Sequence, residues 1–274
     1  MYFQMPMKTK TTAVHALLFA GIILMFPFGG IAQETDTLSR MDTEKALRGL
    51  DVRAISRDGL NFWQNEFSGH WAGIDLGFNL FLNPDYSGYS DDFMDNDIFR
   101  SNSLYFNVVQ QSISLQRYRN SIGLVTGIGL HLQSYRIDDN TTIRRGTNDR
   151  IEPDYLYFDQ NQKSKFSMIS LLVPLLLEAQ VPIKQYENHF YFSAGIFGSV
   201  RIHSQTKIKY KLERREKLKV PDHYSLPDLR YGLMARTGYR GINVFVTYDL
   251  VPLFREGKGP ELTPFTFGIT LLSF

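Results

Sequence analysis

Five charged residues lie in stretches that are otherwise rich in apolar residues and glycine: Asp75, Glu178, Arg201, Arg236 and Asp249. Carboxylates and guanidiniums in such places can form ion pairs, hold a polar ligand or line a pore. An unpaired charge in a buried position strongly destabilises a protein. We therefore interpret the five as a network of ion pairs in a closed interior, and we expect Glu178 to pair with Arg201 or Arg236.

Two histidines lie near serines in a way that suggests hydrolysis of lipids. His203 precedes Ser204, and His131 lies three residues before Ser134. Adjacent residues of a strand point to opposite faces, so His203 and Ser204 cannot act together directly. The sequence contains neither a GxSxG nucleophile elbow nor an HExxH motif. We expect a protein without catalysis or cofactor. A lipid-modifying enzyme is an alternative to this expectation.

Three further motifs raise the question of ion or phosphate binding. Four acidic residues lie close together, at Asp91, Asp92, Asp95 and Asp97. They lack the glycine and the distal glutamate of a calcium loop, so we interpret them as a solvated loop without metal. The basic stretch 207–219 (KIKYKLERREKLK) either meets lipopolysaccharide phosphates or forms a solvated hairpin tip. Gly123-x-x-x-Gly127-x-Gly129 lacks the lysine and the helix of a phosphate loop.

Composition limits the class of protein that carries these residues. The chain has 274 residues, of which 43% are hydrophobic and 14% aromatic, and its mean hydropathy is −0.22. These values argue against a bundle of membrane helices but fit a membrane barrel, whose strands place only alternate residues on lipid. The absence of cysteine excludes disulfides and thiolate chemistry. With 30 basic and 28 acidic residues, charge gives no reason to expect nucleic acid as a partner.

The N-terminal segment has the pattern of an export signal. Lys8 and Lys10 precede an apolar run from Ala13 to Phe28, and small residues around Ala32 suit a cleavage site. The run is short for a transmembrane helix, which needs about 20 residues. The sequence thus divides into a cleaved signal peptide at 1–32, a periplasmic lead-in at 33–68 that is a short helix or disordered, and a barrel at 69–274.

Beyond residue 70, apolar residues recur at every second position, which indicates β-strands. Eight stretches show this pattern, at 71–82, 104–117, 121–137, 167–181, 189–205, 229–239, 242–250 and 264–274. A change of parity in the second stretch predicts a bulge near Gln110. The connections alternate between short and long, as in up-and-down membrane barrels. The sequence predicts an all-β fold, an eight-stranded antiparallel up-and-down transmembrane β-barrel.

The two faces of these strands differ in chemistry. One face is bulky and nearly uncharged, whereas the other carries the five charged residues and many glycines. A charge on a lipid-facing position costs about 2–4 kcal/mol at the bilayer midplane, so the uncharged face suits lipid. We predict a barrel in a bacterial outer membrane with both termini in the periplasm. Eight strands leave no aqueous channel, which disfavours a solute pore.

Three stretches resemble the PorT-like outer-membrane β-barrel proteins of Bacteroidota: GHWAGIDLG (69–77), SIGLVTGIGLHLQSYRI (121–137) and VPLLLEAQVP (173–182). The resemblance covers about residues 69–274 and implies an eight-stranded outer-membrane barrel. The namesake of the group is linked to protein secretion, so the first alternative is a component of a secretion complex. The expected partners are outer-membrane lipid and lipopolysaccharide, the barrel-assembly machinery, and a secretion or envelope complex.

Phe274 is similar to the C-terminal aromatic residue by which the barrel-assembly machinery recognises its clients. The bulky residues before it, such as Phe267 and Ile269, have the opposite parity. Either a bulge near Leu271–Leu272 restores the step, or Phe274 is merely the last residue. We expect the barrel to act as a non-catalytic structural, binding or assembly protein, through its outer loops or its periplasmic segment.

Overall fold

The computed structural model describes residues 67–95, 97–116, 121–137, 140–158, 162–182, 189–211 and 214–274. All of them belong to one compact unit, Leu50–Phe274. The predicted signal peptide at 1–32 and all but the last two residues of the predicted lead-in at 33–68 lie outside the described residues. No helix in the described part of the chain combines the length and the apolar character needed to cross a membrane.

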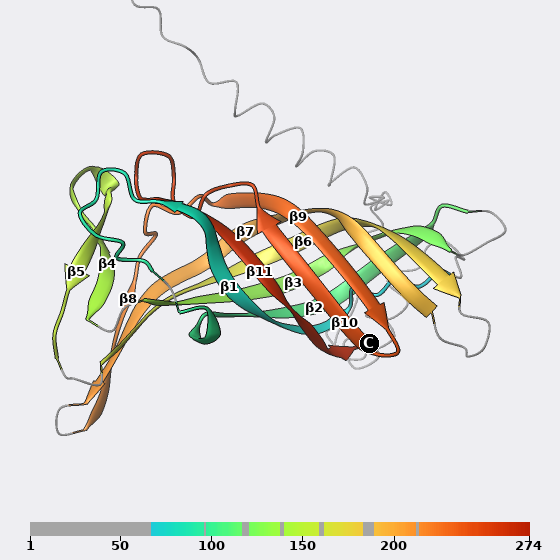
Figure 1. Ribbon diagram of the computed structural model, residues 1–274, viewed down its shortest axis with the longest axis horizontal. Coiled ribbons are helices and arrows are strands. Elements are labelled where there is room, and N and C mark those ends of the chain that lie inside the picture. Colours follow the sequence, from blue (N-terminus) through green and yellow to red (C-terminus); the bar gives the residue numbers. More distant parts are fainter. Residues whose placement is uncertain are drawn as a thin grey trace, which may run out of the picture. The chain divides into compact units, whose positions relative to one another are not determined.

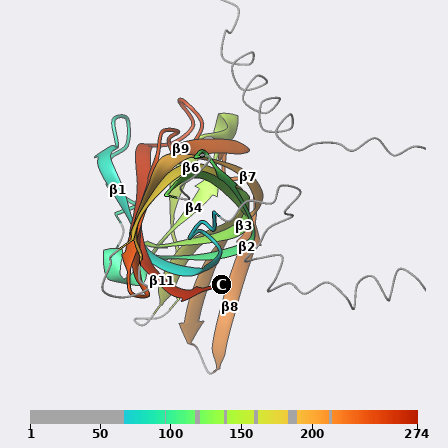
Figure 2. The ribbon, with the colours of Figure 1, turned by 90° about the vertical axis from the view of Figure 1, so that its right-hand side faces the viewer.

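Eight antiparallel strands close into a ring (Figures 1 and 2). In order around the ring they are β1 (Gly73–Asp85), β2 (Asn102–Ser114), β3 (Ile122–Ile137), β6 (Lys163–Pro182), β7 (His189–Lys211), β9 (Leu229–Tyr239), β10 (Ile242–Asp249) and β11 (Glu261–Ser273). β11 pairs back onto β1, so every ring strand has a hydrogen-bonded neighbour on both sides. The predicted all-β, antiparallel, up-and-down order is confirmed.

Burial alternates along the strands with the predicted period of two. On β9, Arg230, Met234 and Arg236 are buried, whereas Tyr231 and Leu233 are exposed. The charged face therefore points into the ring and the bulky face points away from it. This arrangement is the reverse of that in a soluble barrel, where the bulky apolar set fills the interior.

Three short strands lie outside the ring, where the long connections gather (Figure 1). We call this the loop end, and the opposite end, with the short connections, the turn end. β4 (Thr141–Arg145) and β5 (Ile151–Tyr155) form a separate hairpin. β8 (Arg215–Pro221) pairs with the extended part of β7, and we call this pair the β7–β8 ribbon. The sequence analysis did not predict β4 and β5, and it gave a hairpin tip at 207–219 only as one of two alternatives.

Irregularities in register lie where the sequence changes parity. Between β2 and β3 the register shifts between Asn107 and Val109, next to the predicted bulge at Gln110. Between β1 and β11 the pairing skips Leu271. This second bulge brings Phe274, which is 44% exposed, into step with the outward apolar residues of β11. That alignment is what the assembly-signal interpretation of Phe274 requires.

Two single-turn 3-10 helices lie in the connections at the loop end, η1 (Ile98–Arg100) and η2 (Thr147–Asp149). At the N-terminus of η1, the carboxylate of Asp97 accepts a hydrogen bond from the backbone N–H of Phe99. This bond satisfies one of the donors that a helix start leaves free. One of the four clustered aspartates therefore caps a turn.

Candidate functional site

The interior of the ring is filled by side chains rather than open. Its apolar core consists of Phe67, Trp71, Tyr105, Val125, Leu172, Leu176, Phe197, Met234 and Phe245, all nearly inaccessible to solvent. Eight strands enclose only enough space for side chains, and this core occupies it together with buried charges. Leu172 and Leu176 have the parity of the inward residues of their strand, so the sequence pattern could have identified them as interior residues. The more numerous bulky residues of the outward face obscured this signal.

The most buried ion pair joins two of the predicted residues. Arg236 Nη1 and Nη2 donate to the two carboxylate oxygens of Asp75, at 2.7 and 3.1 Å, and the side chains are 2% and 1% exposed. Asn107 Nδ2 (2.8 Å) and Thr270 Oγ1 (2.6 Å) donate to the same carboxylate. Such a two-pronged contact with further donors satisfies a buried carboxylate fully. Two of the five predicted charges thus pair with each other.

A second ion pair lies nearer the loop end and includes a residue absent from the predicted network. Arg230 pairs with Asp249, and the side chains are 4% and 7% exposed. Arg230 Nη1 also donates to Gln133 Oε1 at 3.1 Å. Arg230 has the same inward parity as Arg236, so alternation could have identified it as the partner of Asp249.

The predicted partner of Glu178 is wrong. Its carboxylate accepts a hydrogen bond from the backbone N–H of His70 (3.1 Å), lies 2.7 Å from His70 Nδ1, and accepts a bond from Gln180 Nε2 at 2.8 Å. Arg236 is bound to Asp75 across the ring, and Arg201 lies at the loop end. Glu178 therefore holds the segment that precedes β1 rather than a neighbouring arginine.

That segment, residues 67–72, lies inside the ring at the turn end. Gln110 accepts the N–H groups of Trp71 and Ala72 at 2.7 and 2.8 Å, and its Nε2 donates to the Gly69 carbonyl at 2.8 Å. We call this segment the inner plug. Alternation does not predict how this segment docks, because the docking depends on Gln110, which lies two residues from the unpaired Val108 of the bulge.

The glycines that superficially resemble a phosphate loop make room for the inner plug. A Cβ atom on Gly123 would overlap the ring of Phe67, and one on Gly127 would lie 2.5 Å from Trp71 Cζ3. A Cβ on Gly129 would meet Trp71 as well. The glycine spacing on β3 therefore serves close packing of two aromatic rings.

The two histidine–serine pairs have structural contacts of another kind. His131 Nε2 lies 3.0 Å from Ser103 Oγ rather than at Ser134, and its ring stacks on Tyr105 at 3.8 Å between centroids. Ser134 instead contacts Ser167. On β7, Ser204 is buried and donates to the backbone of the connection after β8, whereas His203 lies on the outward face. Neither pair forms a serine, histidine and acid arrangement in the part of the chain that the structure describes.

The mouth at the loop end is covered by a second apolar cluster, which we call the cap. It consists of Phe93, Met94, Tyr135, Ile137, Ile143, Ile151, Phe166, Met168, Tyr224, Leu226, Leu253, Phe254 and Leu262. The acidic loop contributes Phe93 and Met94, which are buried although the aspartates around them are solvated. Tyr86 packs against the cap, and burial, aided by Asp92 and Asp95, raises the pKa of its phenol. The long connections are thus packed against one another.

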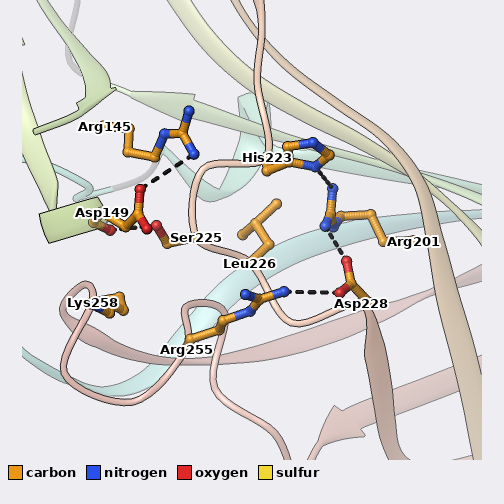
Figure 3. A pocket seen from close by; sticks show the side chains of 9 residues that line it. All are labelled: Arg145, Asp149, Arg201, His223, Ser225, Leu226, Asp228, Arg255 and Lys258. Carbon is orange, nitrogen blue, oxygen red and sulfur yellow. Dashed lines mark hydrogen bonds and ion pairs between the residues drawn. The ribbon is translucent and has the colours of Figure 1, made fainter.

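A pocket of about 280 Å³ opens beside the cap (Figure 3). Its lining holds four cationic side chains against two carboxylates, from Arg145, Arg201, Arg255, Lys258, Asp149 and Asp228. Asp228 accepts from both Arg201 and Arg255. An excess of cationic donors around a small cavity suits a carboxylate or phosphate group.

Arg201 was predicted to lie in the interior network, and the structure places it in this pocket. A bulge between β6 and β7 shifts the register here: Ser170 lies opposite Arg201, and Ile169 opposite His203. The Arg201 side chain is only 6% exposed, and its Nε has no hydrogen-bond partner among the described residues. The bulge follows Arg201, at Ile202, so Arg201 keeps the inward parity of Phe197 and Ser199. Alternation therefore predicted its face, but not its partner Asp228, which lies in a connection.

Among the residues that the structure describes, no group of three or more His, Asp or Glu side chains could hold a metal ion. Comparisons with family models, with curated proteins and with solved structures find no match for this chain. Of the five predicted charges, two form a pair with each other, Asp249 pairs with Arg230, Glu178 holds the inner plug, and Arg201 lines the pocket.

Proposed function

We propose that this protein is an integral outer-membrane β-barrel, closed to solutes, that acts without catalysis as a binding or assembly surface at its loop end. One observation carries the membrane setting: the outward face of the ring is a continuous exposed apolar surface. Exposed members include Val108, Leu130, Leu175, Ile196, Leu233, Val246 and Ile269. Soluble monomers rarely leave contiguous apolar patches larger than a few hundred Å².

Charged residues are likewise divided between the inward and outward faces of the ring. Asp75, Arg236, Arg230 and Asp249 point inward and pair, whereas the central outward positions of the ring strands carry no charged residue. A closed ring also pairs its backbone groups within the protein, which is a requirement in hydrocarbon. The packed interior supports a role in binding rather than in passage of solutes.

The loop end supports the binding role. The cap and the cationic pocket of Figure 3 are built from connections that pack against one another, so they present a defined surface. Binding sites in proteins are commonly carried by loops that a rigid scaffold positions. The ring provides that scaffold.

Two arginine substitutions on the outward face of β7 test the membrane setting. Ile196→Arg places a charge at the middle of the apolar band, and Gln205→Arg places one beyond its edge. In a bilayer the first costs about 2–4 kcal/mol and the second about 0–1 kcal/mol. Urea unfolding of the purified protein in lipid vesicles measures both. In water, exposed positions tolerate such changes within about 0.5 kcal/mol, so equal stabilities for the two variants would refute the membrane setting.

A further inference from the structure

On one side of the ring the outward face changes from apolar to basic towards the loop end. Residues that lie directly opposite each other on neighbouring strands share a face, so the register defines rows that cross β3, β6, β7 and β8. Leu130, Leu171 and Val200 form one such row, and each is more than a third exposed. This row belongs to the apolar band.

The next rows towards the loop end become progressively polar. Leu132, Ile169 and His203 are followed by Ser134, Ser167 and Gln205. Then come Arg136, Lys165, Lys207 and Lys219, and after them Lys163, Lys209 and Lys217. We call the six lysines of these last two rows the lysine face. It continues the lipid-facing side of the wall without a change of side.

The lysines of the lysine face repel one another. Lys207 lies opposite both Lys165 and Lys219, and Lys209 lies opposite both Lys163 and Lys217. Like charges directly opposite each other destabilise a sheet. No carboxylate of the described chain forms an ion pair with any of these six lysines.

The nearest acidic residue of the β7–β8 ribbon lies on its other side. Glu216 is opposite Tyr210, whose hydroxyl donates to the Glu216 carboxylate at 2.9 Å. Burial, and then the charges of Lys209, Lys219 and Lys217, lower the pKa of Lys207. An external anion would remove this repulsion.

The height of the lysine face relative to the apolar band indicates which anion. Lys165 is four residues beyond Ile169 on β6. At about 3.3 Å per residue and a strand tilt of about 40°, the two differ by about 10 Å along the ring axis. The polar interface of a bilayer is about 5–8 Å thick on each side, and lysine side chains can bend towards it. The lysine face therefore lies at the level of lipid headgroups.

We propose that the lysine face binds the phosphate groups of lipopolysaccharide in the leaflet beside β6, β7 and β8. The inference rests on the proposed function, since it requires the apolar rows to lie in the bilayer. One amphiphilic molecule then meets both parts of the wall: its acyl chains contact Leu171 and Val200, and its phosphates contact the lysines. A soluble acidic protein would use the lysines but would leave the adjoining apolar rows without a partner.

Native mass spectrometry of the detergent-solubilised protein, titrated with diphosphoryl lipid A, tests this inference. The variant Lys217→Gln/Lys219→Gln removes two exposed charges from β8, outside the ring. The control Arg100→Gln/Arg144→Gln removes two exposed charges that already pair with surface carboxylates. Each lysine near an anionic surface contributes about a fivefold gain in affinity, so we expect binding about 25-fold weaker in the first variant and unchanged in the control.

Three further probes separate the sources of anion. Dephosphorylated lipid A should bind at least tenfold more weakly than the diphosphoryl form. Neither millimolar inorganic phosphate nor poly-glutamate should displace bound diphosphoryl lipid A. Equal binding by the two variants, indifference to the lipid phosphates, or displacement by either soluble anion would overturn the inference. The Ile196 and Gln205 variants report on membrane insertion separately, so a protein that passes that test but fails this one leaves the proposed function in place.

Discussion

Replacing Arg236 by methionine removes one partner of the most buried ion pair and leaves the Asp75 carboxylate without its two guanidinium donors. Asn107 and Thr270 still donate to it, but no positive charge remains within bonding distance among the described residues. Breaking a buried pair in this way costs about 3–5 kcal/mol. Asp75→Leu should cost a similar amount, because it leaves the Arg236 guanidinium unpaired.

The double variant Asp75→Leu/Arg236→Met contains no unpaired buried charge. Its main defect is the Asn107 amide without its acceptor, a penalty of about 1–3 kcal/mol. The single effects therefore exceed the double effect, and the coupling energy should be at least about 3 kcal/mol. As a comparison, the exposed pair of Arg144 and Glu152, at 3.2 Å, should show a coupling below about 1 kcal/mol.

Urea titration in lipid vesicles, read from the different gel mobilities of folded and heat-denatured protein, gives the free energy of unfolding for all four forms. Additive single effects, or a coupling no larger than that of the exposed pair, would show that the interior is wet enough to hydrate the free charge. The reasoning from a dry, closed ring would then fail.

Three other perturbations address separate parts of the molecule. Gly123→Val should displace the Phe67 ring, which fills this position, and lower stability by about 1–3 kcal/mol. Gly198→Ala, where an added Cβ meets nothing within 4 Å, should leave stability within about 0.5 kcal/mol. Thermal unfolding of the two variants compares these effects. Glu178→Ala should lower the melting temperature and quicken proteolysis at the inner plug, since the plug loses its acceptor; unchanged digestion would contradict the assigned contact. A hydrogen bond to Asp91, then burial and the charge of Asp91, raise the pKa of the Tyr155 phenol, so this contact should persist below the ordinary tyrosine pKa and be lost as pH rises through the raised value. Carbon-13 labelling of tyrosine should show a lower pKa for Tyr155 in Asp91→Asn, and an unchanged titration would refute the link.

The strands and their facing were predictable because they depend on local alternation. The eight stretches appear in the sequence as alternation of apolar residues. The bulges near Gln110 and at Leu271 appear as changes of parity within a few residues. Ion-pair partners were less predictable, because they depend on which walls of the ring face each other. Glu178 and Arg236 both lie opposite Ser193, in one row across β6, β7 and β9, yet Asp75 reaches Arg236 from across the interior. Register alone does not show that crossing.

Residues in the connections were the least predictable. The cationic pocket draws on Arg145 at the end of β4, Asp228 before β9 and Arg255 between β10 and β11. No periodic pattern relates these positions. The short strands β4 and β5 likewise lie in segments that the sequence analysis treated as loops, since five residues hold too few repeats for alternation to be recognised.

In the proposed membrane setting, the unequal lengths of the ring strands have a consequence for the surrounding bilayer. β6 has 20 residues and β10 has 8, so at about 3.3 Å per residue and about 40° of tilt the wall rises about 50 Å at β6 but only about 20 Å at β10. A hydrocarbon core is about 30 Å thick. In that setting, lipid beside β10 would thin to match the protein, whereas lipid beside β6 would not. Such a thickness gradient would orient the molecule within the membrane plane and give neighbouring proteins a preferred side of approach.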